Sequence, residues 1–132
     1  MAAIVVNGGR EVTLNYVVGA TQSAQGLTLH YYVNAATVSA ALTVGNLTEC
    51  TEAGYASAAL TTTNWTTVGG TTTFGTEQTT TFAGSPGTQT VYGYYYTRTT
   101  DGSLFAVEEL GAPFAVQNNG DNIKMTPEID MT

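Results

Sequence analysis

The sequence has little charge, and positive charge is the scarcest. Of its 132 residues only three are Lys or Arg, against ten Asp or Glu, which gives a net charge of −7 at pH 7. Nucleic acids and anionic membranes are bound through basic surfaces, so this composition argues against both as partners. Such a low charge also suits a protein that packs against neighbours better than it suits a freely soluble monomer.

Cysteine and long apolar runs are also scarce. Cys50 is the single cysteine, so one chain can form neither an internal disulfide nor a cysteine metal cluster. No apolar run approaches the roughly 20 residues that span a bilayer. The first residues lack the basic start and apolar core of a secretory signal. We therefore expect synthesis in a cytoplasm, with any extracellular location reached by assembly or lysis.

Threonine, glycine and tyrosine are plentiful. Hydrophobic residues make up 42% of the chain, and tyrosine outnumbers phenylalanine by eight to four. Thr, Tyr and Val favour strands, whereas Gly and Asn supply turns. The composition and spacing predict one all-β domain over residues 1–132, an antiparallel, jelly-roll-like β-sandwich of about eight or nine short strands.

Alternation of apolar and polar residues locates these strands. Residues 10–18 could also be helical, but their β-branched residues favour a strand over 12–18. Residues 1–26 form either an arm or peripheral strands. Loops are expected at 19–26, 34–46 and 83–87, and turns at 99–102 and 118–121. The segments of extended character from which these eight or nine strands are drawn are residues 4–6, 12–18, 27–34, 47–52, 57–61, 64–68, 71–74, 79–82, 89–98, 103–110 and 122–131.

The last third of the chain carries the clearest pattern. In the strand predicted at 122–131, Ile123, Met125, Ile129 and Met131 share one parity. In the strand predicted at 89–98, alternation places Tyr92, Tyr94 and Tyr96 on one face, with Val91, Gly93, Tyr95 and Thr97 on the other. Such a tyrosine face could belong to the core or its rim, contact another subunit, or stack a ligand. We take these three tyrosines as the candidate subunit or capsid interface.

Residues that carry chemistry are few and lack a recognisable pattern. His30 is the only histidine, and neither it nor Cys50 has an evident orienting partner for nucleophilic catalysis. Glu108 and Glu109 point to opposite faces of a strand, so they cannot act as a paired acid and base. The sequence places no oxygen ligands at the alternating spacing of a calcium loop, and residues 118–122 read as a hairpin turn. We expect no catalytic, cofactor-binding or metal-binding residues, and a protein that is not an enzyme.

The order of motifs resembles a family of small structural proteins from tailed bacteriophages. The most specific block is Tyr-Gly-Tyr at 92–94, followed by an acidic strand and by Asn-Gly-Asp at 119–121 before Thr126-Pro127. The resemblance covers most of the chain. It runs through residues 9–11 (GRE), 27–34 (LTLHYYVN), 47–56 (LTECTEAGYA), Trp65, 91–96 (VYGYYY), 104–108 (LFAVE), Pro113 and 119–127 (NGDNIKMTP).

This resemblance implies a β-sandwich that helps to build a virion. Size and charge fit best a capsid decoration or cement protein, which sits on the outer capsid surface as a homotrimer and clamps neighbouring major capsid proteins. A receptor- or carbohydrate-binding module of a tail or head fibre is the alternative. The chain has Thr, Ala or Tyr at positions that are charged in those proteins, so the resemblance does not identify the contact surface.

Overall fold

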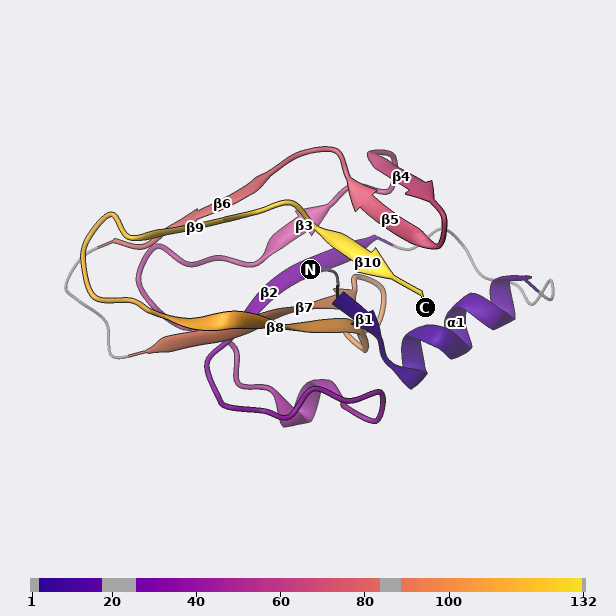
Figure 1. The fold of residues 1–132 in the computed structure, drawn as a ribbon, viewed down its shortest axis with the longest axis horizontal. Helices are drawn as coiled ribbons and strands as arrows, with labels where there is room; N and C mark the ends of the chain where they lie inside the picture. Colours follow the sequence, from indigo (N-terminus) through magenta and orange to yellow (C-terminus); the bar gives the residue numbers. More distant parts are fainter. Residues whose placement is uncertain (1–2, 18–25, 84–88, 132) are drawn as a thin grey trace.

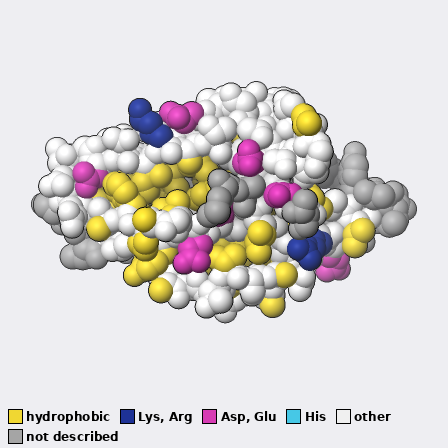
Figure 2. Space-filling model, in the orientation of Figure 1, with side chains coloured by type: hydrophobic (Ala, Val, Ile, Leu, Met, Phe, Trp, Pro, Cys, Tyr) yellow, Lys and Arg dark blue, Asp and Glu magenta, His cyan; other side chains and the backbone are white. Residues whose placement is uncertain are grey.

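A computed structural model describes residues 3–17, 26–83 and 89–131. The predicted all-β class is confirmed: strands make up 47% of the structure and helix 9%, in a curled mixed sheet of eight strands and a second, two-stranded sheet. The two packed layers give the sandwich-like shape seen in Figure 1, and hydrophobic side chains gather across the middle of the same view in Figure 2. Of the loops predicted at 19–26 and 83–87, residues 19–25 and 84–87 lie outside the described residues.

The large sheet has the strand order β3-β2-β7-β8-β1-β10-β5-β4, and the small sheet pairs β6 with β9. Most neighbours are antiparallel, and the pair β1–β10 is parallel. The elements are β1 (Ala3–Val5), α1 (Asn7–Val17), β2 (Leu27–Tyr32), the 3-10 helix η1 (Val44–Asn46), β3 (Ala58–Leu60), β4 (Trp65–Val68), β5 (Thr71–Phe74), β6 (Gln78–Thr81), β7 (Thr90–Arg98), β8 (Leu104–Ala115), β9 (Asn122–Met125) and β10 (Glu128–Asp130).

The strands β2, β7 and β8 form the centre of the fold and are covered on both faces. One face contributes to the main core between the layers, which also contains Phe74 and Phe82. The other face packs against the segment at 36–47, which runs beneath the sheet in Figure 1. The loop predicted at 34–46 therefore has a structural role, because it buries a second apolar surface of the central strands.

The first strand lies inside the sheet. β1 pairs in parallel with β10, with Ala3 beside Ile129, and antiparallel with β8, with Ile4 beside Val107. Of the segment 1–26 considered as an arm or peripheral strands, residues 3–5 form this interior strand and residues 7–17 form a helix. Residues 18–25 of that segment lie outside the described part of the chain.

The strand predicted at 12–18 is wrong, because residues 7–17 form helix α1. Gly9 permits the helix to pack closely on the sheet: a Cβ atom there would lie 2.4 Å from the carbonyl oxygen of Phe105. The hydroxyl of Thr13 donates a hydrogen bond to the Gly9 carbonyl, one helical turn earlier, at 3.0 Å, so this β-branched residue fits in the helix. Tertiary packing thus outweighs the strand preference of the β-branched residues.

The strand predicted at 122–131 is divided in two. β9 belongs to the small sheet and β10 to the large one, and Thr126 and Pro127 separate them. Pro127 has no N–H to donate to a strand ladder, although its carbonyl accepts a hydrogen bond from Phe74 N–H at 2.8 Å. Ile129 is buried as its parity predicted, whereas Met131 is exposed.

Candidate functional site

The prediction that Tyr92, Tyr94 and Tyr96 share one face of a strand is wrong. The pairing of β7 with β8 shifts register between Val91 and Gly93. This irregularity interrupts the alternation, so Tyr94 and Tyr96 join Val91 in the main core. Tyr92 instead packs with Tyr95 in the second cluster. A β-bulge reverses the side-chain parity beyond it, which strict period-two counting cannot foresee.

The burial of these tyrosines limits what they can contact. Tyr94 is 5% exposed and Tyr96 is fully buried, so neither offers a surface in the folded chain. Tyr92 is partly buried against the segment at 36–47. Contact with another subunit stays a prediction for Tyr92 alone, and the exposed tyrosine platform is not formed.

Glu108 lies inside the structure, while Glu109 is exposed, as their alternation predicted. Glu108 is 7% exposed, and its carboxylate accepts a hydrogen bond from the Tyr94 hydroxyl at 2.7 Å. Burial, together with this hydrogen bond to a carboxylate, raises the pKa of Tyr94 far above its usual range. The pair is therefore a buried polar contact of the core.

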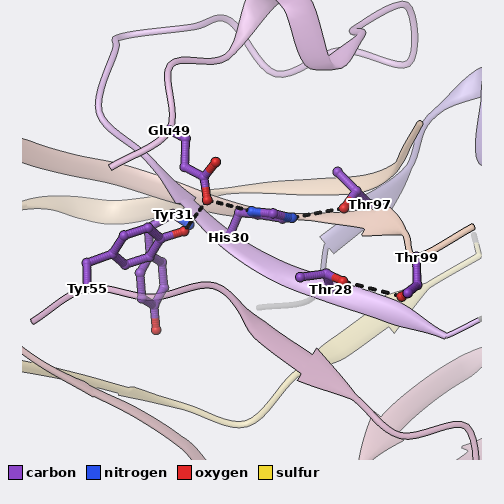
Figure 3. Close-up of polar contacts among 7 residues, drawn as sticks. All are labelled: Thr28, His30, Tyr31, Glu49, Tyr55, Thr97 and Thr99. Atoms are coloured by element: carbon purple, nitrogen blue, oxygen red, sulfur yellow. Dashed lines mark hydrogen bonds and ion pairs between the residues drawn. The ribbon is translucent and has the colours of Figure 1, made fainter. Parts of the chain in front are cut away.

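His30 has partners that the sequence did not reveal. Its Nδ1 lies 2.7 Å from Glu49 Oε1, and its Nε2 lies 2.9 Å from the Thr97 hydroxyl (Figure 3). Tyr55 donates a hydrogen bond to the same oxygen of Glu49 at 2.8 Å. The imidazole also stacks on Tyr95, with ring centroids 4.8 Å apart. We call His30, Glu49, Tyr55 and Thr97 the His30 cluster.

The His30 cluster joins distant parts of the chain. Glu49 reaches β2 through an isolated bridge to Tyr32, and the Tyr31 N–H donates to the Tyr55 oxygen at 3.2 Å. No sequence spacing indicates these contacts, because the partners lie on the three separate segments β2, 49–55 and β7. Glu52 takes no part in the cluster and accepts a hydrogen bond from the Gln89 N–H at 2.8 Å.

The order carboxylate–imidazole–hydroxyl in this cluster is the order found in nucleophilic triads. A nucleophile must be reachable by substrate, and Thr97 in β7 is only 7% exposed. Both ring nitrogens of His30 are engaged within the fold. We interpret the cluster as a clasp that fixes the segment at 49–55 against the sheet.

Acid is expected to weaken this clasp. Burial tends to raise the pKa of Glu49, but hydrogen bonds from His30 and Tyr55 outweigh it, so the pKa is lowered. A lowered carboxyl pKa stabilises the fold above the unfolded value of about 4.3, and this contribution disappears as pH falls through the folded pKa. Because Glu49 is partly exposed, we expect roughly 0.5–1 kcal/mol from it.

Unfolding in urea at several pH values tests this expectation. Glu49→Gln should be less stable than wild type near pH 7, and the difference should shrink below about pH 4. The variant His30→Asn, measured in the same way, removes the imidazole but keeps the Glu49 carboxylate, so it isolates the contribution of the imidazole. A difference between wild type and Glu49→Gln that stays constant down to pH 2.5 would contradict the assignment.

Other reactive or charged side chains are engaged in local structure. Cys50 is buried, which raises the pKa of its thiol. The turn predicted at 118–121 is confirmed: the Asp121 carboxylate accepts hydrogen bonds from the N–H groups of Gln117 and Asn118, which lower its pKa. Among the described residues, no three His, Cys, Asp or Glu side chains gather as a metal site would require.

The strand β4 lies at one edge of the large sheet. It pairs with β5 on one side, from Trp65 beside Phe74 to Val68 beside Thr71, and with no described strand on the other. Sheet edges are usually blunted by charge, proline or bulges. Residues 53–76 contain no charged residue and no proline, and Val68 is 75% exposed. Among the described residues, this edge thus has neither a strand partner nor the charge or proline that usually blocks one.

Comparison of the chain with protein-family models, curated proteins and solved structures gave no match. Within the described residues, no helix has the length and apolarity needed to cross a membrane.

Proposed function

We propose that the chain is a structural protein of a tailed-phage virion. Its most fitting role is that of a capsid decoration or cement protein, which clamps neighbouring major capsid proteins on the outer head surface. The motif order from residue 9 to residue 127 supports the phage assignment by resemblance. The all-β fold with its exposed, uncharged edge at β4 supports a role in assembly.

The β4 edge is the observation on which the proposed role rests. A strand edge presents unpaired N–H and C=O groups that another chain can bind through main-chain hydrogen bonds. The β4–β5 hairpin offers such an edge without a charge that would repel a protein surface. In this proposal β4, and not the tyrosine strand, provides the contact between subunits.

The proposed assembly is a homotrimer. A closed ring of three copies uses a head-to-tail contact, in which the β4 edge of one copy meets a different surface of the next. Three linked copies can bind a capsid tightly even when each contact is weak, since the later contacts form within one complex. No strongly charged surface is needed for this mode of binding.

A charge on the edge should prevent trimer formation. We expect light scattering of the purified chain at micromolar concentration to give a trimer mass, and Val68→Lys to give a monomer with an unchanged circular dichroism spectrum. Val44→Lys is the matched control, because Val44 is also an exposed valine but lies in η1. A wild-type monomer would contradict the proposed trimer, and a Val68→Lys trimer would exclude β4 as the contact.

Cryo-microscopy of the virion tests the location. Hundreds of copies on the capsid lattice are expected for a cement protein, and particles that lack it should lose DNA more readily on heating or osmotic shock. Density confined to the tail, or particles of unchanged robustness, would contradict this role. Tail density would favour the receptor- or carbohydrate-binding alternative.

A further inference from the structure

An apolar cavity opens between α1 and the curled sheet. Its volume is about 340 Å³, within the range of cavities that hold small ligands. The lining side chains carry no charge: two are aromatic, three are aliphatic and three are threonines. They are Thr13, Leu27, Thr62, Trp65, Thr72, Phe105, Ile129 and Met131.

A second hollow adjoins this cavity. It measures about 390 Å³ and is lined by Arg10, Thr13, Leu14 and Met131. Thr13 and Met131 line both spaces, so the two lie next to each other beside α1, and we call them together the trough. Leu14 and Met131 are exposed there, so apolar surface continues from the cavity to the outside.

Arg10 supplies a positive charge at the outer end of the trough. It forms no ion pair with the described residues, whereas Arg98 pairs with Asp101 and His30 with Glu49. Of the described residues, no other charged one lines either space. The trough therefore combines an apolar inner end with a single cation at the outer end, on a protein whose net charge is −7.

We propose that this trough binds a medium-chain alkanoate or another linear molecule with an aliphatic tail and one carboxylate. The tail would lie among Leu27, Trp65 and Phe105, and the carboxylate would pair with Arg10. Guanidinium binds carboxylate through parallel hydrogen bonds, and one cation balances one negative charge. A neutral molecule would leave the Arg10 charge without a counter-charge, and a polyanion would carry more negative charge than Arg10 can balance. The proposal does not rest on the role in the virion, although Trp65 belongs to β4, the strand proposed above as the subunit contact.

The fluorescence of Trp65 reports on the cavity directly, because it is the only tryptophan in the chain. Titration with sodium decanoate below its micelle concentration should give a saturable change in emission. Arg10→Gln should weaken decanoate binding about ten-fold, which corresponds to the loss of one charged hydrogen-bonded pair. Decanol, which has the same tail without the charge, should bind wild type and Arg10→Gln equally, and wild type more weakly than decanoate does.

Two further variants separate the trough from the general surface. Thr13→Phe places a ring where the two spaces meet and should abolish the response to both molecules, with circular dichroism confirming the fold. Lys124→Gln removes an exposed cation in β9, on the small sheet, and should leave decanoate binding unchanged. Absence of a saturable response, equal decanoate affinity in Arg10→Gln, or full binding by a folded Thr13→Phe would each overturn the proposal.

Discussion

Replacing Gly93 with alanine is expected to destabilise the fold by roughly 3 kcal/mol or more. A Cβ atom at this position would lie 2.1 Å from the carbonyl oxygen of Glu108 and 2.5 Å from the Tyr32 hydroxyl. Neither neighbour can easily move away from the added methyl group. The Glu108 carbonyl belongs to the backbone of β8, and the Tyr32 ring has no exposed surface. The central strands β2, β7 and β8 would have to separate. Urea unfolding monitored by circular dichroism measures the loss.

Gly111→Ala is the matched control. Gly111 lies in β8, adjacent to β7, and an added Cβ there would meet no atom within 4 Å. We expect a change within about 1 kcal/mol, and a slight gain is consistent with reduced freedom of the unfolded chain. Equal effects of the two substitutions would show that the close approach of Tyr32 and β8 to Gly93 does not limit stability.

Tyr94→Phe is expected to cost about 1.5–3 kcal/mol. The substitution keeps the ring but removes the hydroxyl that donates to the Glu108 carboxylate. Glu108 is then left buried without this donor, and such a loss at a charged group is costlier than the loss of a neutral hydrogen bond. The free energy of unfolding at pH 7, compared with wild type, tests this expectation.

Tyr96→Phe distinguishes the lost hydrogen bond from a general effect of removing a hydroxyl. The Tyr96 hydroxyl is buried without a well-formed hydrogen bond among the described residues, and the Glu128 backbone is its polar neighbour. Burial raises the pKa of Tyr96, so the group stays neutral at pH 7. We expect Tyr96→Phe to be neutral or stabilising by up to about 1 kcal/mol. A cost equal to that of Tyr94→Phe would remove the Glu108 contact as the cause.

Local pattern was sufficient for much of the fold. Alternation located β2 and β7 closely, and the turn at 99–102 is formed, with Gly102 at a φ of 71°. These elements are determined by residues close together in the sequence, so the local pattern is enough to predict them. The opposite orientations of Glu108 and Glu109 follow from the same period of two.

Other features depend on contacts between distant residues. The bulge near Gly93 arises because β8 carries extra residues opposite Tyr92, which the sequence of β7 alone does not show. Helix α1 depends on Gly9 fitting against Phe105, almost a hundred positions away. The pairing of His30 with Glu49 likewise requires the fold, since no motif spacing joins the two residues.

The position of β1 has a consequence for how the protein folds during synthesis. Its partners are residues 106–107 of β8 and 129–130 of β10, so both of its ladders close loops of about a hundred residues or more. Contacts so distant along the chain form slowly, because a large loss of chain entropy precedes any gain from pairing. On the ribosome, β1 has no completed site until residue 130 has emerged. The large sheet is therefore completed only after translation of nearly the whole domain, with the first strand made among the last to be enclosed.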